Sequence, residues 1–229
     1  KPSKVVAPTL SEFEAAHEIV AQVANLTPVL HSNFLSNLTG AEVWLKAENL
    51  QRTGAYKLRG AYNRMSKLTA AERRKGVVAA SAGNHAQGVA LAAKKLGIKA
   101  TIFMPVGASL PKFQATQNYG ATVVMEGAVF AETLKAAQEY AAKKGAIFIP
   151  PFDHIDVVIG QGTVGIEILD QVPDVQTILV GIGGGGLAAG VAVAAKLEAA
   201  RQGRKIKVIG VQSENSAAYL TSLKAGKPV

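Results

Sequence analysis

The chain has 229 residues, of which 48% are hydrophobic, 18% charged and 6% aromatic, with 23 glycines and 9 prolines. This composition excludes intrinsically disordered, collagen-like and disulfide-stapled proteins, and the length suffices for one large domain or two modest ones. The chain contains no cysteine, which excludes disulfides, thiolate metal sites and cysteine nucleophiles. A cytoplasmic protein is therefore expected.

The net charge and one apolar run bear on the partners of the chain. Lysine and arginine outnumber aspartate and glutamate by 25 to 16, a formal net charge of +9, which attracts anions of any size. The basic residues are scattered and are not interleaved with aromatics, so no nucleic-acid partner is expected. Residues 178–195 carry no charge, but their glycines would weaken a lipid-facing helix, so no membrane segment is expected.

Short β-branched runs alternate with longer alanine-rich runs along the chain. This alternation predicts βαβ units and an α/β fold with two open, mostly parallel sheets flanked by helices. The predicted strands span residues 43–46, 77–80, 100–104, 122–125, 146–150, 177–181 and 207–212. The predicted helices span residues 12–24, with Ser11 as N-cap and Glu14 completing a capping box, then 60–68, 85–96, 112–119, 129–144, 162–171, 187–200 and 216–223.

Two segments indicate crossings between domains. The first is the polar stretch 48–54, and the second is the proline pair Pro150-Pro151, which breaks any helix or central strand. A discontinuous layout is therefore predicted. Residues 50–152 form a smaller inserted domain, and residues 1–49 and 153–229 form the larger one.

A run of glycines follows the apolar strand 177–181 and opens an alanine-rich helix. Its members are Gly183, Gly184, Gly185 and Gly186, followed by Leu187. Successive glycines let backbone N–H groups surround an anion, and the helix N-terminus adds positive potential, so a phosphate site is predicted. The alternative is a tight turn with close packing, which does not require four glycines in succession.

The same loop also matches a G-x-G-x-x-G pattern through Gly181, Gly183 and Gly186. A dinucleotide site of this type has an acidic residue about 20 positions further on. The first suitable acid is Glu214, which lies too far along the chain. NAD binding therefore stays an alternative of second rank.

A polar segment, Ser81-Ala-Gly-Asn-His-Ala-Gln-Gly88, directly follows the strand 77–80. Ser81, Asn84 and His85 are suited to holding a carboxylate or phenolate oxygen at a helix N-terminus. The alternative is that Ser81 or Asn84 only caps the helix that follows. No metal-ligand spacing surrounds His85, so no metal is expected.

A third segment, Thr53-Gly-Ala-Tyr-Lys-Leu-Arg-Gly60, places Lys57 where a loop enters a helix. The neighbouring Arg59 and the helix N-terminus both favour a neutral amine and so predict a lowered pKa for Lys57. By itself the signal is faint, since most lysines on helices are solvated. Together, a phosphate cradle, a polar anion pocket and a lysine able to form a Schiff base are the parts of a pyridoxal-phosphate site.

These segments resemble the threonine dehydratase (threonine ammonia-lyase) branch of the fold-type-II pyridoxal-phosphate enzymes, a tryptophan-synthase-β-like fold. The stretch 48–61 resembles the lysine segment of that family, 81–88 its substrate loop and 183–187 its phosphate loop. Ile149-Pro-Pro-Phe-Asp153 and Gly160-Gln-Gly-Thr163 occur in the expected order. The resemblance covers nearly the whole chain and is nearest the catabolic form.

The resemblance implies a role for each matching residue. Lys57 holds pyridoxal phosphate covalently and moves the substrate α-proton, with Tyr56 beside the cofactor in place of the usual phenylalanine. Asn84 contacts the ring oxygen of the cofactor and, with Ser81, Gly83 and His85, surrounds the substrate. The backbone N–H groups of residues 183–187 bind the phosphate.

The implied reaction is β-elimination of water from L-threonine, which gives 2-oxobutanoate and ammonia, with L-serine as a second substrate. Ala55 replaces a usual serine, and Ala82 stands where related serine racemases carry a second serine, which favours elimination over racemisation. Family members continue past the position of Val229, and the part beyond it supplies the residue that faces the pyridine nitrogen. A serine racemase or dehydratase, and a non-catalytic fragment that keeps the pocket, are the alternatives. A homo-oligomer, dimer or tetramer, is also implied.

Overall fold

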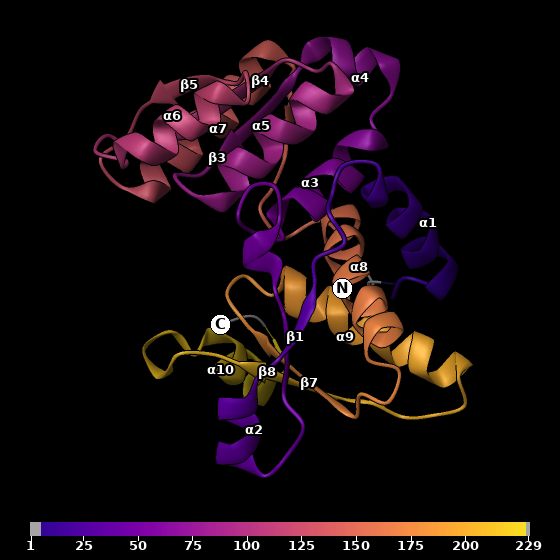
Figure 1. Ribbon diagram of the computed structural model, residues 1–229. Coiled ribbons are helices and arrows are strands. Elements are labelled where there is room, and N and C mark those ends of the chain that lie inside the picture. Colours follow the sequence, from indigo (N-terminus) through magenta and orange to yellow (C-terminus); the bar gives the residue numbers. More distant parts are fainter. Residues whose placement is uncertain (1–5, 228–229) are drawn as a thin grey trace.

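The computed structural model describes residues 6–227 and shows an α/β fold with helices packed against its sheets, as the sequence predicts (Figure 1). The strands are β1 (Val29–His31), β2 (Trp44–Lys46), β3 (Val77–Ala80), β4 (Ala100–Met104), β5 (Thr122–Met125), β6 (Ile147–Phe148), β7 (Thr177–Gly181) and β8 (Lys207–Val211). The helices are α1 (Leu10–Ala21), α2 (Asn33–Thr39), α3 (Lys57–Ser66), α4 (Ala70–Lys75), α5 (Asn84–Leu96), α6 (Leu110–Asn118), α7 (Phe130–Lys144), α8 (Ile155–Gln171), α9 (Gly186–Arg201) and α10 (Ala218–Ala225), with short 3-10 turns η1 (Glu48–Leu50) and η2 (Glu214–Ser216).

A four-stranded parallel sheet in the order β5-β4-β3-β6 forms the upper lobe of Figure 1. Successive residues of its strands face opposite sides: Val77 and Ala79 pack with α3 and α5, whereas Val78 and Ala80 pack with α7. Because both faces are covered, the strands are apolar throughout, which is typical of parallel sheets. Because these apolar runs are continuous, the strands are easy to predict, and β3, β4 and β5 have the predicted bounds.

Helices α3, α8 and α9 approach one another through glycines. A Cβ atom on Gly160 of α8 would lie 2.7 Å from the Cα of Gly60 in α3. On the other side of α8, a Cβ on Gly190 of α9 would lie 2.7 Å from the backbone nitrogen of Gly162. The predicted helix starts at residue 162, but α8 starts at Ile155. Its glycines belong to the helix interior, where they permit close packing.

The remaining strands form two small sheets. β7 and β8 pair in parallel, and β1 and β2 pair antiparallel. β1, α2, α4 and the 3-10 turns were not predicted, since each is too short to show a clear period in the sequence.

The N-cap prediction for the first helix is wrong. The helix begins at Leu10 with Thr9 as N-cap, and the Glu12 carboxylate accepts a hydrogen bond from the Thr9 backbone N–H at 2.8 Å. Thr9 with Glu12 and Ser11 with Glu14 have the same spacing, so the sequence pattern fits both pairs equally well.

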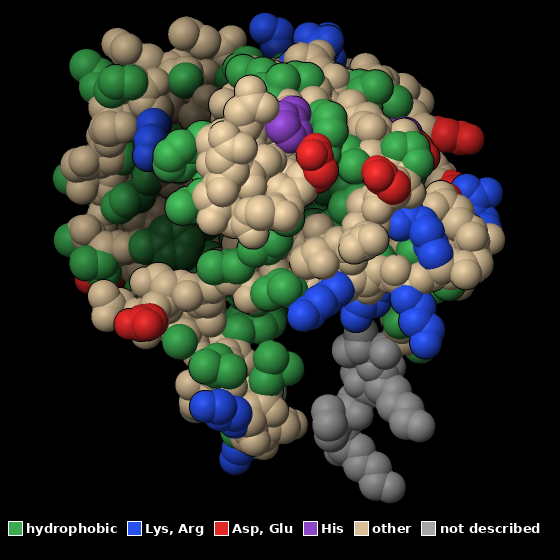
Figure 2. Space-filling view, turned by 60° about the horizontal axis from the view of Figure 1, so that its bottom comes forward, with side chains coloured by type: hydrophobic (Ala, Val, Ile, Leu, Met, Phe, Trp, Pro, Cys, Tyr) green, Lys and Arg blue, Asp and Glu red, His purple; other side chains and the backbone are tan. Residues whose placement is uncertain are grey.

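The end of the molecule formed by α2, β7 and α10 exposes large apolar side chains. Phe34, Leu38, Leu179 and Leu223 are each at least two-thirds exposed. Figure 2, which brings this end toward the viewer, shows hydrophobic side chains in the open around a hollow. Within residues 6–227, no helix combines the length and the hydropathy needed to cross a membrane.

Candidate active site

Lys57 lies where a loop enters a helix, as predicted, but α3 starts at Lys57 itself, three residues before the predicted start at residue 60. Only a minor part of Lys57 is exposed. Its Nζ donates a hydrogen bond to the carbonyl oxygen of Pro151 at 2.7 Å, and lies 5.4 and 5.9 Å from the ring centroids of Tyr56 and Phe152. Burial lowers the pKa of the Lys57 amine below its ordinary value, because the charged form loses its hydration. The lowered pKa is thus as predicted, but its cause is burial and not Arg59, whose guanidinium pairs with Glu48 and Glu167.

A cavity of about 430 Å³ brings the three predicted segments together. The lysine segment, the polar segment after β3 and the glycine loop after β7 all contribute to its wall. The lining residues are Tyr56, Lys57, Ala80, Ser81, Asn84, His85, Phe130, Pro151, Phe152, Gly183 and Gly184. No carboxylate is among these lining residues, which suits an anionic guest.

The other predicted site residues are not among the residues that line the cavity. Gly83 is the N-cap of α5, Gly185 is the N-cap of α9, and Gly186 and Leu187 begin α9. Sequence reasoning assigned no site role to Phe130, Pro151 or Phe152. The proline pair was a usable signal for the last two, whereas Phe130 shows none beyond its place at the start of a helix.

The glycine loop is shaped for close backbone approach. Gly185 has φ +87°, in the region that favours glycine, and a Cβ there would overlap the hydroxyl of Tyr219. A Cβ on Gly184 would overlap the ring of Phe152. A Cβ on Gly183 would meet no atom within 4 Å, so the backbone of this residue borders open space in the cavity wall.

In the polar segment at the start of α5, neither Ser81 nor Asn84 is the N-cap of the helix, in contrast to the capping alternative. The N-cap of α5 is Gly83 and makes no side-chain cap bond, while Ser81 Oγ accepts a hydrogen bond from the Gly83 backbone N–H at 3.1 Å. Asn84 is exposed to the cavity. The first backbone N–H groups of the helix are therefore not satisfied by a side-chain cap.

His85 is buried beneath the cavity, and its Nε2 lies 2.9 Å from the carbonyl oxygen of Ile149. Nε2 therefore carries the proton and donates it, which leaves Nδ1 as an acceptor. Burial lowers the pKa of His85 to about 4, against a weaker opposing effect of the Ile149 hydrogen bond. The ring is neutral at pH 7.

Replacing His85 by glutamine is expected to flatten the pH dependence of stability. Between pH 6.5 and 4 the unfolded chain protonates this histidine and the folded chain does not, so stability falls as the pH falls. Between pH 7.5 and 4.5, the unaltered protein should lose at least about 1.4 kcal/mol more than His85→Gln, the equivalent of one pKa unit. Urea unfolding at both pH values measures the difference, and equal losses in the two proteins would contradict the buried neutral state.

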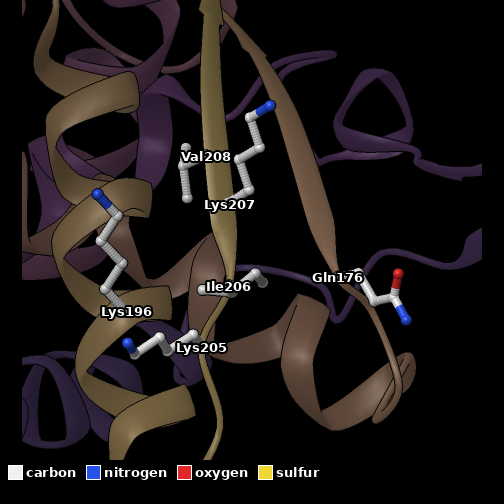
Figure 3. A pocket seen from close by; sticks show the side chains of 6 residues that line it. All are labelled: Gln176, Lys196, Lys205, Ile206, Lys207 and Val208. Carbon is white, nitrogen blue, oxygen red and sulfur yellow. The ribbon is translucent and has the colours of Figure 1, made fainter.

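A second, larger hollow of about 600 Å³ lies beside β8 and α9, and none of the three predicted segments lines it. Figure 3 shows the side chains of Lys196, Lys205 and Lys207 pointing in different directions, with Gln176 turned away. No acid–base pair or cradle forms there. Among residues 6–227, no group of acidic, histidine or cysteine residues is arranged to hold a metal ion.

The geometry of the first cavity fits a particular class of cofactor. A buried amine with a lowered pKa is suited to covalent attachment of an aldehyde, and the glycine loop at the start of α9 is suited to a phosphate. The fold and site are thus those of an enzyme that uses a phosphorylated aldehyde cofactor.

The chain belongs to the pyridoxal-phosphate dependent enzyme family, whose model matches residues 20–229. Pyridoxal phosphate is the cofactor of this family. An L-threonine ammonia-lyase of Thermotoga maritima is 48% identical over 96% of this chain and 54% of its own length. The catabolic L-threonine dehydratase TdcB of Escherichia coli is 49% identical over 94% of this chain and 64% of its own length.

Solved structures of similar enzymes have the same fold as this chain. Threonine deaminase isoform 2 of Solanum lycopersicum superposes with a TM-score of 0.90 at 41% identity, covering 96% of this chain and 64% of that one. Maize serine racemase superposes with a TM-score of 0.92 at 34% identity, covering 98% of this chain and 67% of that one. The chain thus spans between half and two-thirds of the length of the curated relatives that it matches.

Proposed function

We propose that the full-length protein deaminates L-threonine to 2-oxobutanoate and ammonia, with L-serine as a second substrate that gives pyruvate. The observation that carries this proposal is the meeting of Lys57, the polar segment after β3 and the glycine loop in one cavity. The relatives named L-threonine ammonia-lyase and L-threonine dehydratase support the choice of substrate.

Bound pyridoxal phosphate supplies an electron-accepting ring that stabilises the charge left at the substrate Cα after proton removal. In the proposed site Lys57 Nζ is its covalent anchor, and the backbone N–H groups of Gly183, Gly184, Gly185, Gly186 and Leu187 hold its phosphate. Tyr56 flanks it, and Asn84 donates a hydrogen bond to its ring oxygen. The cradle is narrow at Gly184 and Gly185, where any side chain would collide with Phe152 or Tyr219.

Lys57 is also the proposed base for the substrate α-proton. Burial lowers the pKa of its amine, so the neutral form that can accept a proton is more populated than in a solvated lysine. The Pro151 carbonyl fixes the position of Nζ by accepting a hydrogen bond at 2.7 Å. Burial also raises the pKa of Tyr56, which stays protonated beside the amine.

The start of α5 is the proposed seat of the substrate carboxylate. The backbone N–H groups of Asn84 and His85 are at the positive end of the helix, and Ser81 and Gly83 border them. The His85 ring already donates to Ile149, so His85 contributes through its backbone. With the substrate held there, the β-hydroxyl leaves as water. A second water then hydrolyses the carbon–nitrogen bond of the released imine, which frees ammonia and leaves 2-oxobutanoate.

Elimination is favoured over racemisation because the methyl side chain of Ala82 can neither donate nor accept a proton.

The domain layout and the oligomer are part of the same proposal. Residues 50–152 form a smaller inserted domain, residues 1–49 and 153–229 form the larger domain, and the protein is a cytoplasmic homo-oligomer. The four-stranded sheet, which lies within residues 77–148, supports the inserted domain.

The test is to mix the purified full-length protein with pyridoxal phosphate, reduce it with borohydride and map the modified peptide. We expect a visible absorbance band that borohydride bleaches, one pyridoxyl group per chain on Lys57, and formation of 2-oxobutanoate when L-threonine is added before reduction. An adduct spread over surface lysines would refute the assignment of Lys57. A correct adduct with no turnover of threonine or serine would refute the proposed reaction and keep the cofactor site.

A further inference from the structure

Two residues beyond Lys57, the side chain of Arg59 enters a buried network of charges that the proposed reaction does not use. Its guanidinium has no exposed surface, and all five of its N–H groups can be paired. The Nε and Nη2 atoms donate to the Glu48 carboxylate at 2.9 and 2.8 Å. Nη1 and Nη2 donate to the Glu167 carboxylate at 2.6 and 2.8 Å, and Nη1 also donates to the Thr163 hydroxyl at 3.2 Å.

The network is closed and electrically balanced. Lys46 Nζ pairs with the second oxygen of Glu167 at 2.6 Å, so two cations face two carboxylates, and His17 lies 3.6 Å from Glu167. The side chains of Arg59, Glu167 and Lys46 are less than a tenth exposed, and that of Glu48 is 14% exposed. Buried charges of this kind persist only where every partner is in place, so the network fixes the segments that carry it.

Those segments surround the first turn of α3, which begins with Lys57. Glu48 lies in η1 and Glu167 in α8, so the guanidinium joins α3 to both. Behind the turn, a Cβ on Gly88 of α5 would lie 3.1 Å from the carbonyl carbon of Lys57, which shows how closely α5 supports it. The Gln161 side chain of α8 accepts a hydrogen bond from the Gly60 backbone N–H at 3.1 Å.

The same helix α8 is preceded by the loop that supplies the hydrogen-bond partner of Lys57. Pro151 accepts from Nζ and Phe152 lies beside it, three to four residues before α8 begins. The contacts between the first turn of α3 and α8 therefore position both the backbone of Lys57 and the Pro151 carbonyl oxygen that accepts its hydrogen bond.

We infer that Arg59 is a positioning residue for Lys57: its double fork to Glu48 and Glu167 holds the first turn of α3 so that Nζ stays in the desolvated cavity against the Pro151 carbonyl. Arginine is needed because a planar fork can satisfy two carboxylates at once, whereas a lysine has three donors at one point. This inference rests on the proposed role of Lys57.

The structure provides a matched control on the same pair of helices. Lys67, next to the C-terminal end of α3, donates to the Asp156 carboxylate near the start of α8 at 2.7 Å. This ion pair also joins α3 to α8, but it lies ten residues from Lys57. Loss of Lys67 therefore tests whether any weakening of the helix pair is enough to disturb the site.

The experiment measures the reactivity of Lys57 in the cofactor-free, full-length protein. Pyridoxal phosphate is added at a series of pH values, trapped with borohydride, and the pyridoxyl group on Lys57 is quantified by peptide mapping. The midpoint of the pH curve reports the amine, since Tyr56 and His85, the other titratable groups in the cavity wall, are neutral at pH 7. The variants are Arg59→Lys, Glu48→Gln and the control Lys67→Met.

We expect Arg59→Lys and Glu48→Gln each to move the midpoint to higher pH and to slow labelling of Lys57 at pH 7 several-fold, while Lys67→Met leaves both unchanged. The two variants distinguish the effect of a displaced Lys57 side chain from the effect of a changed charge nearby. Arg59→Lys keeps the positive charge, and Glu48→Gln removes a negative one, which by its field alone would move the midpoint to lower pH.

A folded Arg59→Lys protein with the unaltered midpoint, or a downward shift in Glu48→Gln, would overturn the inference. If Arg59→Lys does not fold, Glu48→Gln decides, because Glu48 is the more exposed of the two carboxylates that pair with Arg59. If the unaltered protein fails to label at Lys57, the proposed function has failed and not the positioning role.

Discussion

Replacing Lys57 by arginine in the full-length protein is expected to lower turnover of L-threonine by at least about 10²–10⁴-fold, the usual contribution of one proton-transferring group. A guanidinium stays protonated at any pH that a protein tolerates, so it neither attaches to an aldehyde nor accepts the α-proton. The rate of 2-oxobutanoate formation measures the loss, and the absorbance spectrum measures the attached cofactor.

Lys94→Arg is the matched control, because Lys94 is an exposed lysine on α5 and lies outside the cavity wall. It should keep the activity of the unaltered protein. A Lys57→Arg variant that retained more than a tenth of that activity would show that another group moves the proton.

Adding one methyl group to the glycine loop is expected to separate cofactor binding from folding. At Gly183 a Cβ meets no atom and the residue lines the cavity, so Gly183→Ala should fold normally and place the methyl group at the cavity wall. We expect pyridoxal phosphate to bind at least about tenfold more weakly, which corresponds to about 1.4 kcal/mol. The free energy of unfolding of the cofactor-free protein should change by less than about 0.5 kcal/mol.

Gly185→Ala is expected to damage both properties. Its φ of +87° strains an alanine, and the Cβ would overlap the Tyr219 hydroxyl, so about 1–3 kcal/mol of stability should be lost in addition to affinity. Gly181→Ala is the control: it ends β7, is exposed, and has room for a Cβ. Spectroscopic titration with the cofactor and urea unfolding give the two quantities, and a Gly183→Ala protein of unchanged affinity would place the phosphate elsewhere.

The three loops that meet in the cavity could be predicted because each carries its own local signal. A strand followed by successive glycines and a helix is visible around Gly183, and a strand followed by small polar residues is visible around Ser81. Phe130 carried no such signal. Its place in the cavity depends on where α7 starts relative to β3, which is a matter of packing between segments distant in the chain.

The sequence by itself determined the parallel strands and their alternation with helices, since periodicity and glycine runs act over a few neighbouring residues. It also predicted Lys57 as the reactive amine. The sequence did not indicate that α8 starts at Ile155. Gly160 and Gly162 are suited to this helix because Gly60 and Gly190 pack closely against them.

Tertiary structure alone decided what surrounds the amine. Arg59, two residues after Lys57 in the chain, pairs with carboxylates in η1 and α8 that lie 11 and 108 residues away, while burial lowers the pKa of the amine. Desolvation and ion pairing depend on which distant segments come together in the fold. The spacing of residues along the chain does not predict these contacts.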